Sequence, residues 1–179
     1  MSDRTFFLKP FLSDNLPLQL EISGIVDRQF NKLTIQYQIL GQLAELAIPA
    51  LTDSPTRKDE LWQQTCLEFF LGIEDSSQYW EFNLSPSGNW NIYHFEDYRQ
   101  GMQTETAFTS LPFVVHNRPN YLLLNLELDL DKIVEIEQKI EIAIASVIQS
   151  KSGEMTYWAL THCGTQADFH QRDSFTIKL

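Results

Sequence analysis

The segment YWEFNLSPSGNWNIYHFEDYRQGM, residues 79–102, decides the fold because it contains two runs of alternating apolar and polar side chains around one turn. Alternation with a period of two is typical of a strand that has one face in a core. The four residues Ser85-Pro86-Ser87-Gly88 separate the runs, and their composition is typical of a turn. We therefore predict a β-hairpin with strands at residues 79–84 and 89–95.

The apolar residues of the two runs predict how the hairpin strands pair. If these residues face one core, residues 85–87 form the loop, Gly88 takes a positive φ, and the core pairs are Phe82–Trp90 and Trp80–Ile92. The opposite face then carries the pairs Tyr79–Tyr93, Glu81–Asn91 and Asn83–Asn89. One face of the hairpin is thus expected to be apolar and the other to be lined by Tyr, Glu and Asn.

The preceding run, TCLEFFL at residues 65–71, is expected to join the same sheet. Matching its apolar residues to the first hairpin strand gives the pairs Leu67–Leu84, Phe69–Phe82 and Leu71–Trp80. This register places Glu68 beside Asn83 and puts Cys66 and Phe70 on the same side. A second carboxylate is therefore predicted on the polar face.

Alternating runs recur along the whole chain of 179 residues, which is long enough for one domain, residues 1–179, with a single core. Further strand candidates occupy residues 6–12, 18–23, 33–39, 121–128, 140–148, 155–161 and 174–178. About ten strands indicate an all-β, antiparallel β-sandwich of the jelly-roll or immunoglobulin-like kind. Residues 131–138 are expected to form at most one or two helical turns, and residues 50–61 and 99–120 are the two long connections.

Composition excludes several functions. The formal net charge of −11 opposes binding to nucleic acid or to an anionic membrane. The N-terminal residues have no signal-peptide pattern and no apolar run approaches the length of a membrane span, so we expect a cytoplasmic protein. Cys66 and Cys163 are expected to be free thiols in that compartment. No zinc-ligand spacing, P-loop, nucleophile elbow or dinucleotide fingerprint is present.

The predicted polar face has the chemistry that an uncharged polyol needs. Aromatic rings cover the apolar faces of a sugar ring, while amides and carboxylates bind pairs of hydroxyl groups. Tyr79, Tyr93, Glu81 and Asn83 supply both kinds of group. The alternative is that these residues form the solvated face of an antiparallel sheet.

Other candidates lie outside the hairpin. Trp62, flanked by Arg57 and Glu60, is either an exposed stacking platform or a core residue at the edge of the sandwich. Tyr157 and Trp158 are adjacent on a strand, so one of them must leave the core face.

The segment THCGTQADFHQRD, residues 161–173, holds further candidates. His162, Asp168 and His170 are open to interpretation as metal ligands, as an acid–base group or as ordinary surface residues. Met102 paired with His162 would be a haem-iron ligand set, and the alternative is an ordinary loop methionine.

Three motifs together resemble the bacterial DOMON-like proteins, which are related to the family 9 carbohydrate-binding modules. They are RKDELWQQTCLEFFL at 57–71, the hairpin at 79–102, and MTYWALTHCGTQADFHQRDSF at 155–175. The resemblance implies a β-sandwich that binds sugars or haem without catalysing a reaction. It also implies that Trp62 stacks on the ligand. Many relatives have an aspartate where this chain has Cys66, which weakens any inference of bound calcium.

We therefore expect a non-catalytic module that binds a saccharide or sugar derivative. No cofactor is expected, although haem and structural calcium stay open, as does the oligomeric state. The alternatives are a haem-binding electron-transfer module, a protein-interaction scaffold, and a hydrolase or lyase that uses His162 or His170 with Asp168. The predicted ligand-binding residues are Arg57, Glu60, Trp62, Glu68, Tyr79, Glu81, Asn83, Tyr93, Tyr98, Arg99, Trp158 and His162.

Overall fold

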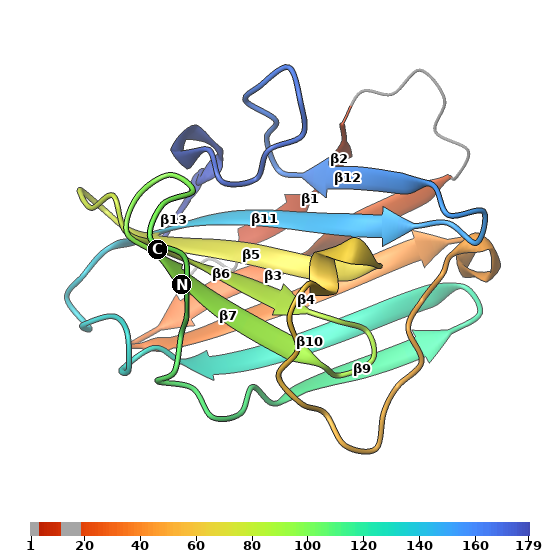
Figure 1. Ribbon diagram of the computed structural model, residues 1–179, viewed down its shortest axis with the longest axis horizontal. Helices are drawn as coiled ribbons and strands as arrows, with labels where there is room; N and C mark the ends of the chain where they lie inside the picture. Colours follow the sequence, from red (N-terminus) through yellow and green to blue (C-terminus); the bar gives the residue numbers. More distant parts are fainter. Residues whose placement is uncertain (1–3, 12–18) are drawn as a thin grey trace.

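The computed structural model describes residues 4–11 and 19–179, and these form two antiparallel β-sheets that pack face to face (Figure 1). One sheet has five strands in the order β1-β3-β4-β10-β9. Its strands are β1 (Arg4–Phe7), β3 (Leu20–Gln29), β4 (Lys32–Gly41), β9 (Phe113–Arg118) and β10 (Tyr121–Asp129). The predicted strand positions Leu12 and Leu18 lie outside the described residues.

The other sheet has eight strands in the order β2-β12-β11-β5-β6-β7-β8, with β13 paired to β11. Its strands are β2 (Lys9–Pro10), β5 (Cys66–Ile73), β6 (Tyr79–Leu84), β7 (Trp90–Phe95), β8 (Gln103–Thr104), β11 (Ile140–Gln149), β12 (Met155–Ala159) and β13 (Ile177–Lys178). This sheet contains the predicted hairpin as β6 and β7, next to β5.

The core lies between the two sheets and is filled by the inward side chains of both. Phe69 and Phe82, on neighbouring strands, stack with ring centroids 4.2 Å apart. Tyr37 reaches across from β4 and donates a hydrogen bond to the Glu68 carbonyl oxygen at 2.7 Å. The apolar face predicted for β5 and β6 is therefore the inner face of the sandwich.

The predicted all-β, antiparallel sandwich is confirmed, with thirteen strands in the described parts of the chain. The strand at Phe113–Arg118 was missed because it is an edge strand that is exposed over most of its length and falls in a predicted loop. The helical turns expected at residues 131–138 are hydrogen-bonded turns, and the described residues contain no α-helix. These same residues form three short 3₁₀ helices: η1 (Leu43–Glu45), η2 (Leu61–Gln63) and η3 (Arg172–Ser174). No helix in the described ranges has the length and apolar character to cross a membrane.

The predicted pairing of β5 with β6 is confirmed residue by residue, but that of β6 with β7 is wrong by two residues. The observed pairs are Leu84–Trp90, Asn83–Asn91, Phe82–Ile92, Glu81–Tyr93, Trp80–His94 and Tyr79–Phe95. The turn explains the difference, because the Ser85 amide donates to the Asn89 carbonyl at 2.9 Å and so closes the loop one residue later. Gly88 has the predicted positive φ, at 92°. A shift of two residues leaves every side chain on its predicted face.

Candidate functional site

The outer face of the eight-stranded sheet is buried where β5, β6 and β7 run side by side. Glu68, Glu81 and Asn83 are exposed by only 2%, 5% and 0%. A second apolar cluster, separate from the core, surrounds them and includes Phe70, Tyr79, Tyr93 and Phe95. The alternative of an open, solvated sheet face is therefore wrong for these residues.

Two segments cover this face. The first is η2, which packs on β5 and β6 and carries Trp62. The Trp62 ring meets the Tyr93 ring edge to face, with centroids 5.7 Å apart. Glu60, just before η2, has a left-handed backbone with φ 59°, and this turns the chain into the helix. Local backbone geometry thus brings Trp62 over the sheet.

The second cover is the connection between β12 and η3, residues 160–171. His170 lies against the rings of Phe70 and Phe95, each with its centroid 5.1 Å away. Its Nδ1 atom shares a hydrogen bond of 2.8 Å with the Tyr79 hydroxyl. This contact fixes the connection to the sheet and brings Phe169 to the same place.

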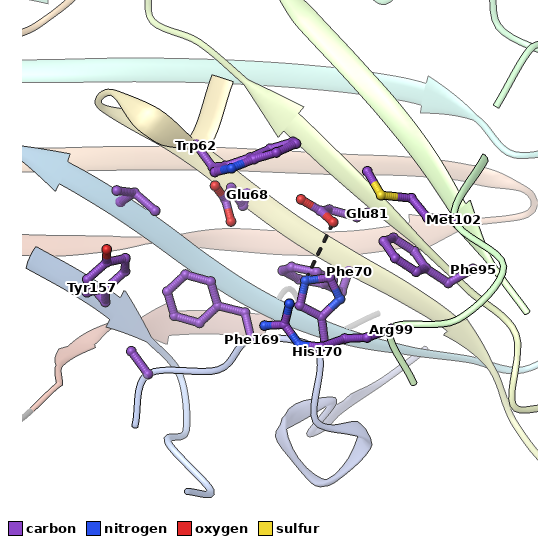
Figure 2. A pocket seen from close by; sticks show the side chains of 12 residues that line it. Trp62, Glu68, Phe70, Glu81, Phe95, Arg99, Met102, Tyr157, Phe169 and His170 are labelled. Carbon is purple, nitrogen blue, oxygen red and sulfur yellow. Dashed lines mark ion pairs between the residues drawn. The ribbon is translucent and has the colours of Figure 1, made fainter. Parts of the chain in front are cut away.

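A pocket of about 350 Å³ opens between these covers and the sheet (Figure 2). Figure 2 shows the Glu68 and Glu81 side chains among aromatic rings that come from several different elements. The lining residues are Trp62, Glu68, Phe70, Glu81, Phe95, Arg99, Met102, Val147, Tyr157, Ala167, Phe169 and His170. The pocket combines the apolar surface and the few convergent polar groups that characterise small-ligand sites.

Burial dominates the electrostatics of the two carboxyl groups. It raises the pKa of Glu81 to about 7, and the pKa of Glu68 lies well above its usual value because of burial and the neighbouring Glu81 charge. Asn83 donates a hydrogen bond to Glu81 Oε1 at 2.9 Å. Glu68 Oε1, in contrast, is buried and has no hydrogen-bond partner. Such an atom is an acceptor that a ligand hydroxyl or amine can satisfy.

His170 is a neutral neighbour of this pair. Burial, followed by the Arg99 charge, lowers the pKa of His170 to about 4. Its Nε2 atom lies 3.7 Å from Glu81 Oε2, the contact marked in Figure 2. At neutral pH this contact joins a neutral ring to the carboxyl group, so it is not an ion pair.

Arg99 lines the pocket but is already engaged by Asp168. Its guanidinium donates to Asp168 Oδ1 at 2.9 Å, and the Tyr98 hydroxyl donates to the other carboxylate oxygen. The His170 amide donates to Asp168 Oδ1 at 3.1 Å. Asp168 therefore ties the cover segment to the connection that follows β7.

The predicted site residues divide into three groups. Trp62, Glu68, Glu81 and Arg99 line the pocket. Tyr79, Asn83 and Tyr93 lie behind them, where Tyr79 bonds His170 and Asn83 bonds Glu81. Tyr93 supports Trp62 and donates to Asp59 Oδ1 at 2.8 Å. Tyr98 is half exposed and contacts Asp168 beside the pocket.

The other four predicted site residues, Arg57, Glu60, Trp158 and His162, are also absent from the pocket lining. Arg57 stacks on the Trp90 ring and donates to Asn91 Oδ1 and to two backbone carbonyls, so its charge supports the 50–61 and 99–120 connections. Glu60 is an exposed residue before η2. His162 Nε2 lies 2.8 Å from the Lys9 carbonyl oxygen, at the other edge of the sheet.

Trp158, predicted to bind the ligand, does not line the pocket. It is buried in the core between the sheets, while its neighbour Tyr157 lines the pocket. The prediction that the two side chains point to opposite faces is correct, but the choice between them is reversed.

The structure does not bring together the ligands proposed for haem or metal. Met102 lines the pocket without His162, and Nδ1 of His170 is occupied by Tyr79. The described residues hold no group of three or more His, Cys, Asp or Glu side chains that could bind a metal ion. Both cysteines are free, as predicted.

Several pocket residues were not predicted as site residues. Strand alternation already placed Phe70 on the polar face, and the same rule extends to Phe95 two residues after Tyr93. Phe169 and Ala167 lie in a connection, where no periodic signal indicates what a side chain will contact.

Comparison with known proteins shows a shared fold. No family model matches the chain, and no curated protein sequence matches it significantly. The structure is similar to that of a proposed carbohydrate-binding protein from Bacteroides uniformis, with a TM-score of 0.64 and 12% identity over 96% of this chain and 84% of that chain. It is also similar to a family 9 carbohydrate-binding module from Caldicellulosiruptor kristjanssonii in complex with glucose, with a TM-score of 0.52 and 12% identity over 89% and 75% of the two chains. The protein therefore has the fold of these β-sandwich modules.

Proposed function

We propose that this chain is a non-catalytic module that binds a saccharide in the pocket lined by Trp62, Glu68 and Phe169. Two structures that share its fold are described as carbohydrate-binding, and one of them holds glucose. Membership of the DOMON-like family and a cytoplasmic location stay predictions.

The observation that carries the proposal is the unpartnered oxygen of Glu68 inside an aromatic pocket. A buried acceptor without a partner is unfavourable, and a ligand hydroxyl would relieve that cost. The surrounding rings of Trp62, Phe95 and Phe169 offer apolar surface to the C–H groups of a sugar ring. Glu81, held by Asn83, can bind a neighbouring hydroxyl.

The size of the pocket limits the ligand. A volume of about 350 Å³ lies at the low end of the range for small-ligand sites, so one or two sugar rings are the expected occupant. A longer chain would have to continue outside the pocket.

A thermal-shift experiment with glucose and cello-oligosaccharides tests this function. A sugar at about 100 times its Kd should add roughly 2.7 kcal/mol to the free energy of unfolding and raise the melting temperature. Trp62→Ala should remove this shift. The matched control is Phe7→Ala, which removes an exposed aromatic residue from β1 in the other sheet. If no saccharide raises the melting temperature of the wild-type protein, the proposed function is wrong.

A further inference from the structure

Two acidic side chains lie together in the pocket. Of the twelve lining residues, Glu68 and Glu81 are carboxylic acids, and Arg99 is the only one with a permanent positive charge. The Arg99 guanidinium is committed to Asp168 at 2.9 Å. His170 bonds Tyr79 through Nδ1 and is neutral at physiological pH. The Arg99 charge acts on Glu81 but its guanidinium is bonded to Asp168, so among the described residues neither carboxyl group has an ion-pair partner that is charged at neutral pH.

Aromatic rings surround these two carboxyl groups. Trp62 comes from η2, Phe70 from β5, and Phe169 from the connection between β12 and η3. A carboxylate together with aromatic ring faces is an environment that recognises organic ammonium groups. The carboxylate accepts a charge-assisted hydrogen bond, and the rings attract the cation through their electron-rich faces.

We propose that the preferred ligand of this pocket is an amino sugar, whose protonated amine donates a hydrogen bond to Glu68 Oε1 and lies near Glu81. This inference rests on the proposed saccharide-binding function and names the class of saccharide. A neutral hydroxyl would satisfy the unpartnered oxygen but would form no ion pair with either carboxyl group. A protonated amine supplies the hydrogen bond and the charge together.

Release of a proton on binding distinguishes an amino sugar from a neutral sugar. Without ligand, Glu81 holds a proton below pH 7, and Glu68 also has a raised pKa. An ammonium group favours the ionised carboxylates, so its binding should displace a proton, whereas binding of a neutral sugar should not. The other groups at the pocket, His170, Arg99 with Asp168, and Tyr79, do not change charge between pH 5.5 and 7. The affinity for an amino sugar should therefore rise across this range.

Isothermal titration calorimetry with D-glucosamine, D-glucose and N-acetyl-D-glucosamine tests the proposal at pH 7. D-Glucosamine should bind about tenfold more tightly than D-glucose, the difference expected from one charge-assisted hydrogen bond. N-Acetyl-D-glucosamine, which has the same nitrogen without the charge, should bind no more tightly than D-glucose. Glu68→Gln should bring the ratio of the two affinities, D-glucosamine over D-glucose, close to one, whatever its effect on the binding of either sugar.

Proton release can be measured on the wild-type protein alone, by titration at pH 6.5 in two buffers of different ionisation enthalpy. Release with D-glucosamine and none with D-glucose is the expected result, and it does not depend on whether a variant folds. Equal affinities for the two sugars, with no proton release, would overturn this inference and leave the saccharide function standing. Cyclohexylamine, which has the amine but not the sugar hydroxyl groups, tests whether the sugar contributes to binding. If it binds as tightly as D-glucosamine, the pocket recognises an amine without a sugar and the proposal fails.

Discussion

Glu81→Gln should stabilise the protein at alkaline pH and have little effect at acid pH. Glu81 is 5% exposed, and its carboxyl group is neutral in the folded protein below pH 7. Glutamine resembles this neutral form and keeps an oxygen that can accept the hydrogen bond from Asn83. The variant therefore preserves the local contacts and removes only the ability to ionise.

The magnitude follows from the shift in pKa. The pKa of Glu81 rises from its ordinary value of 4.5 to about 7 on folding, so between these values the unfolded chain has lost a proton that the folded protein keeps. The contribution of Glu81 to the free energy of unfolding is fully present below pH 4.5 and is lost as the pH rises through 7. Each pH unit in that window is worth about 1.4 kcal/mol, so the whole loss is about 3 kcal/mol. His170, whose lowered pKa destabilises the fold as the pH falls from 6.5 to about 4, contributes equally to both proteins and cancels in their difference.

Urea unfolding of both proteins at pH 5 and pH 8, followed by tryptophan fluorescence, measures this effect. The free energy of unfolding of the variant minus that of the wild type should be about 2 to 3 kcal/mol larger at pH 8 than at pH 5. Glu127→Gln, which removes an exposed carboxylate from β10 in the other sheet, controls for the change in net charge. A difference between variant and wild type that is the same at pH 5 and pH 8 would refute the argument that burial keeps Glu81 protonated.

Three further outcomes are expected. Phe82→Ala, which removes a fully buried ring stacked on a neighbouring phenylalanine, should lower the free energy of unfolding by about 3–5 kcal/mol in urea titration. The exposed Cys163 should react with a thiol reagent in the folded protein, while Cys66, whose pKa is raised by burial, should react only after unfolding. Asp168→Asn weakens the contact with Arg99, so amides in residues 160–171 should exchange faster with deuterium.

Alternation in the sequence predicts the faces of the central strands because side-chain direction in a strand has a period of two. It places Glu68, Glu81 and Asn83 on one face, as the structure has them. It does not decide between registers that differ by two residues, because both keep the same faces. In the hairpin the turn sets the register. There the side chain of Ser87 is hydrogen-bonded to the side chains of Ser85 and Asn89.

The pair Tyr157-Trp158 is a second case in which alternation leaves two arrangements open. Alternation requires the two rings to point to opposite faces, but both are large and amphipathic, so the strand alone does not say which one enters the core. The residues paired with them on β11 determine which ring enters the core. Trp158 lies opposite Ser146, which leaves room for an indole between the sheets, while Tyr157 lies opposite Val147 on the pocket side.

The chemistry of the pocket depends mainly on contacts between segments that are far apart in the sequence. The strand pattern brings two carboxyl groups to one face, and on an open sheet face they would be solvated and ionised at neutral pH. They are buried because Trp62 on η2 and the 160–171 connection lie over them, and this burial is what raises their pKa values. The local sequence therefore specifies the polar groups, whereas the long-range cover raises their pKa values. Removing part of that cover, as in Trp62→Ala, should lower the pKa of Glu68 and Glu81 together, and carboxyl carbon shifts in an NMR titration would measure it.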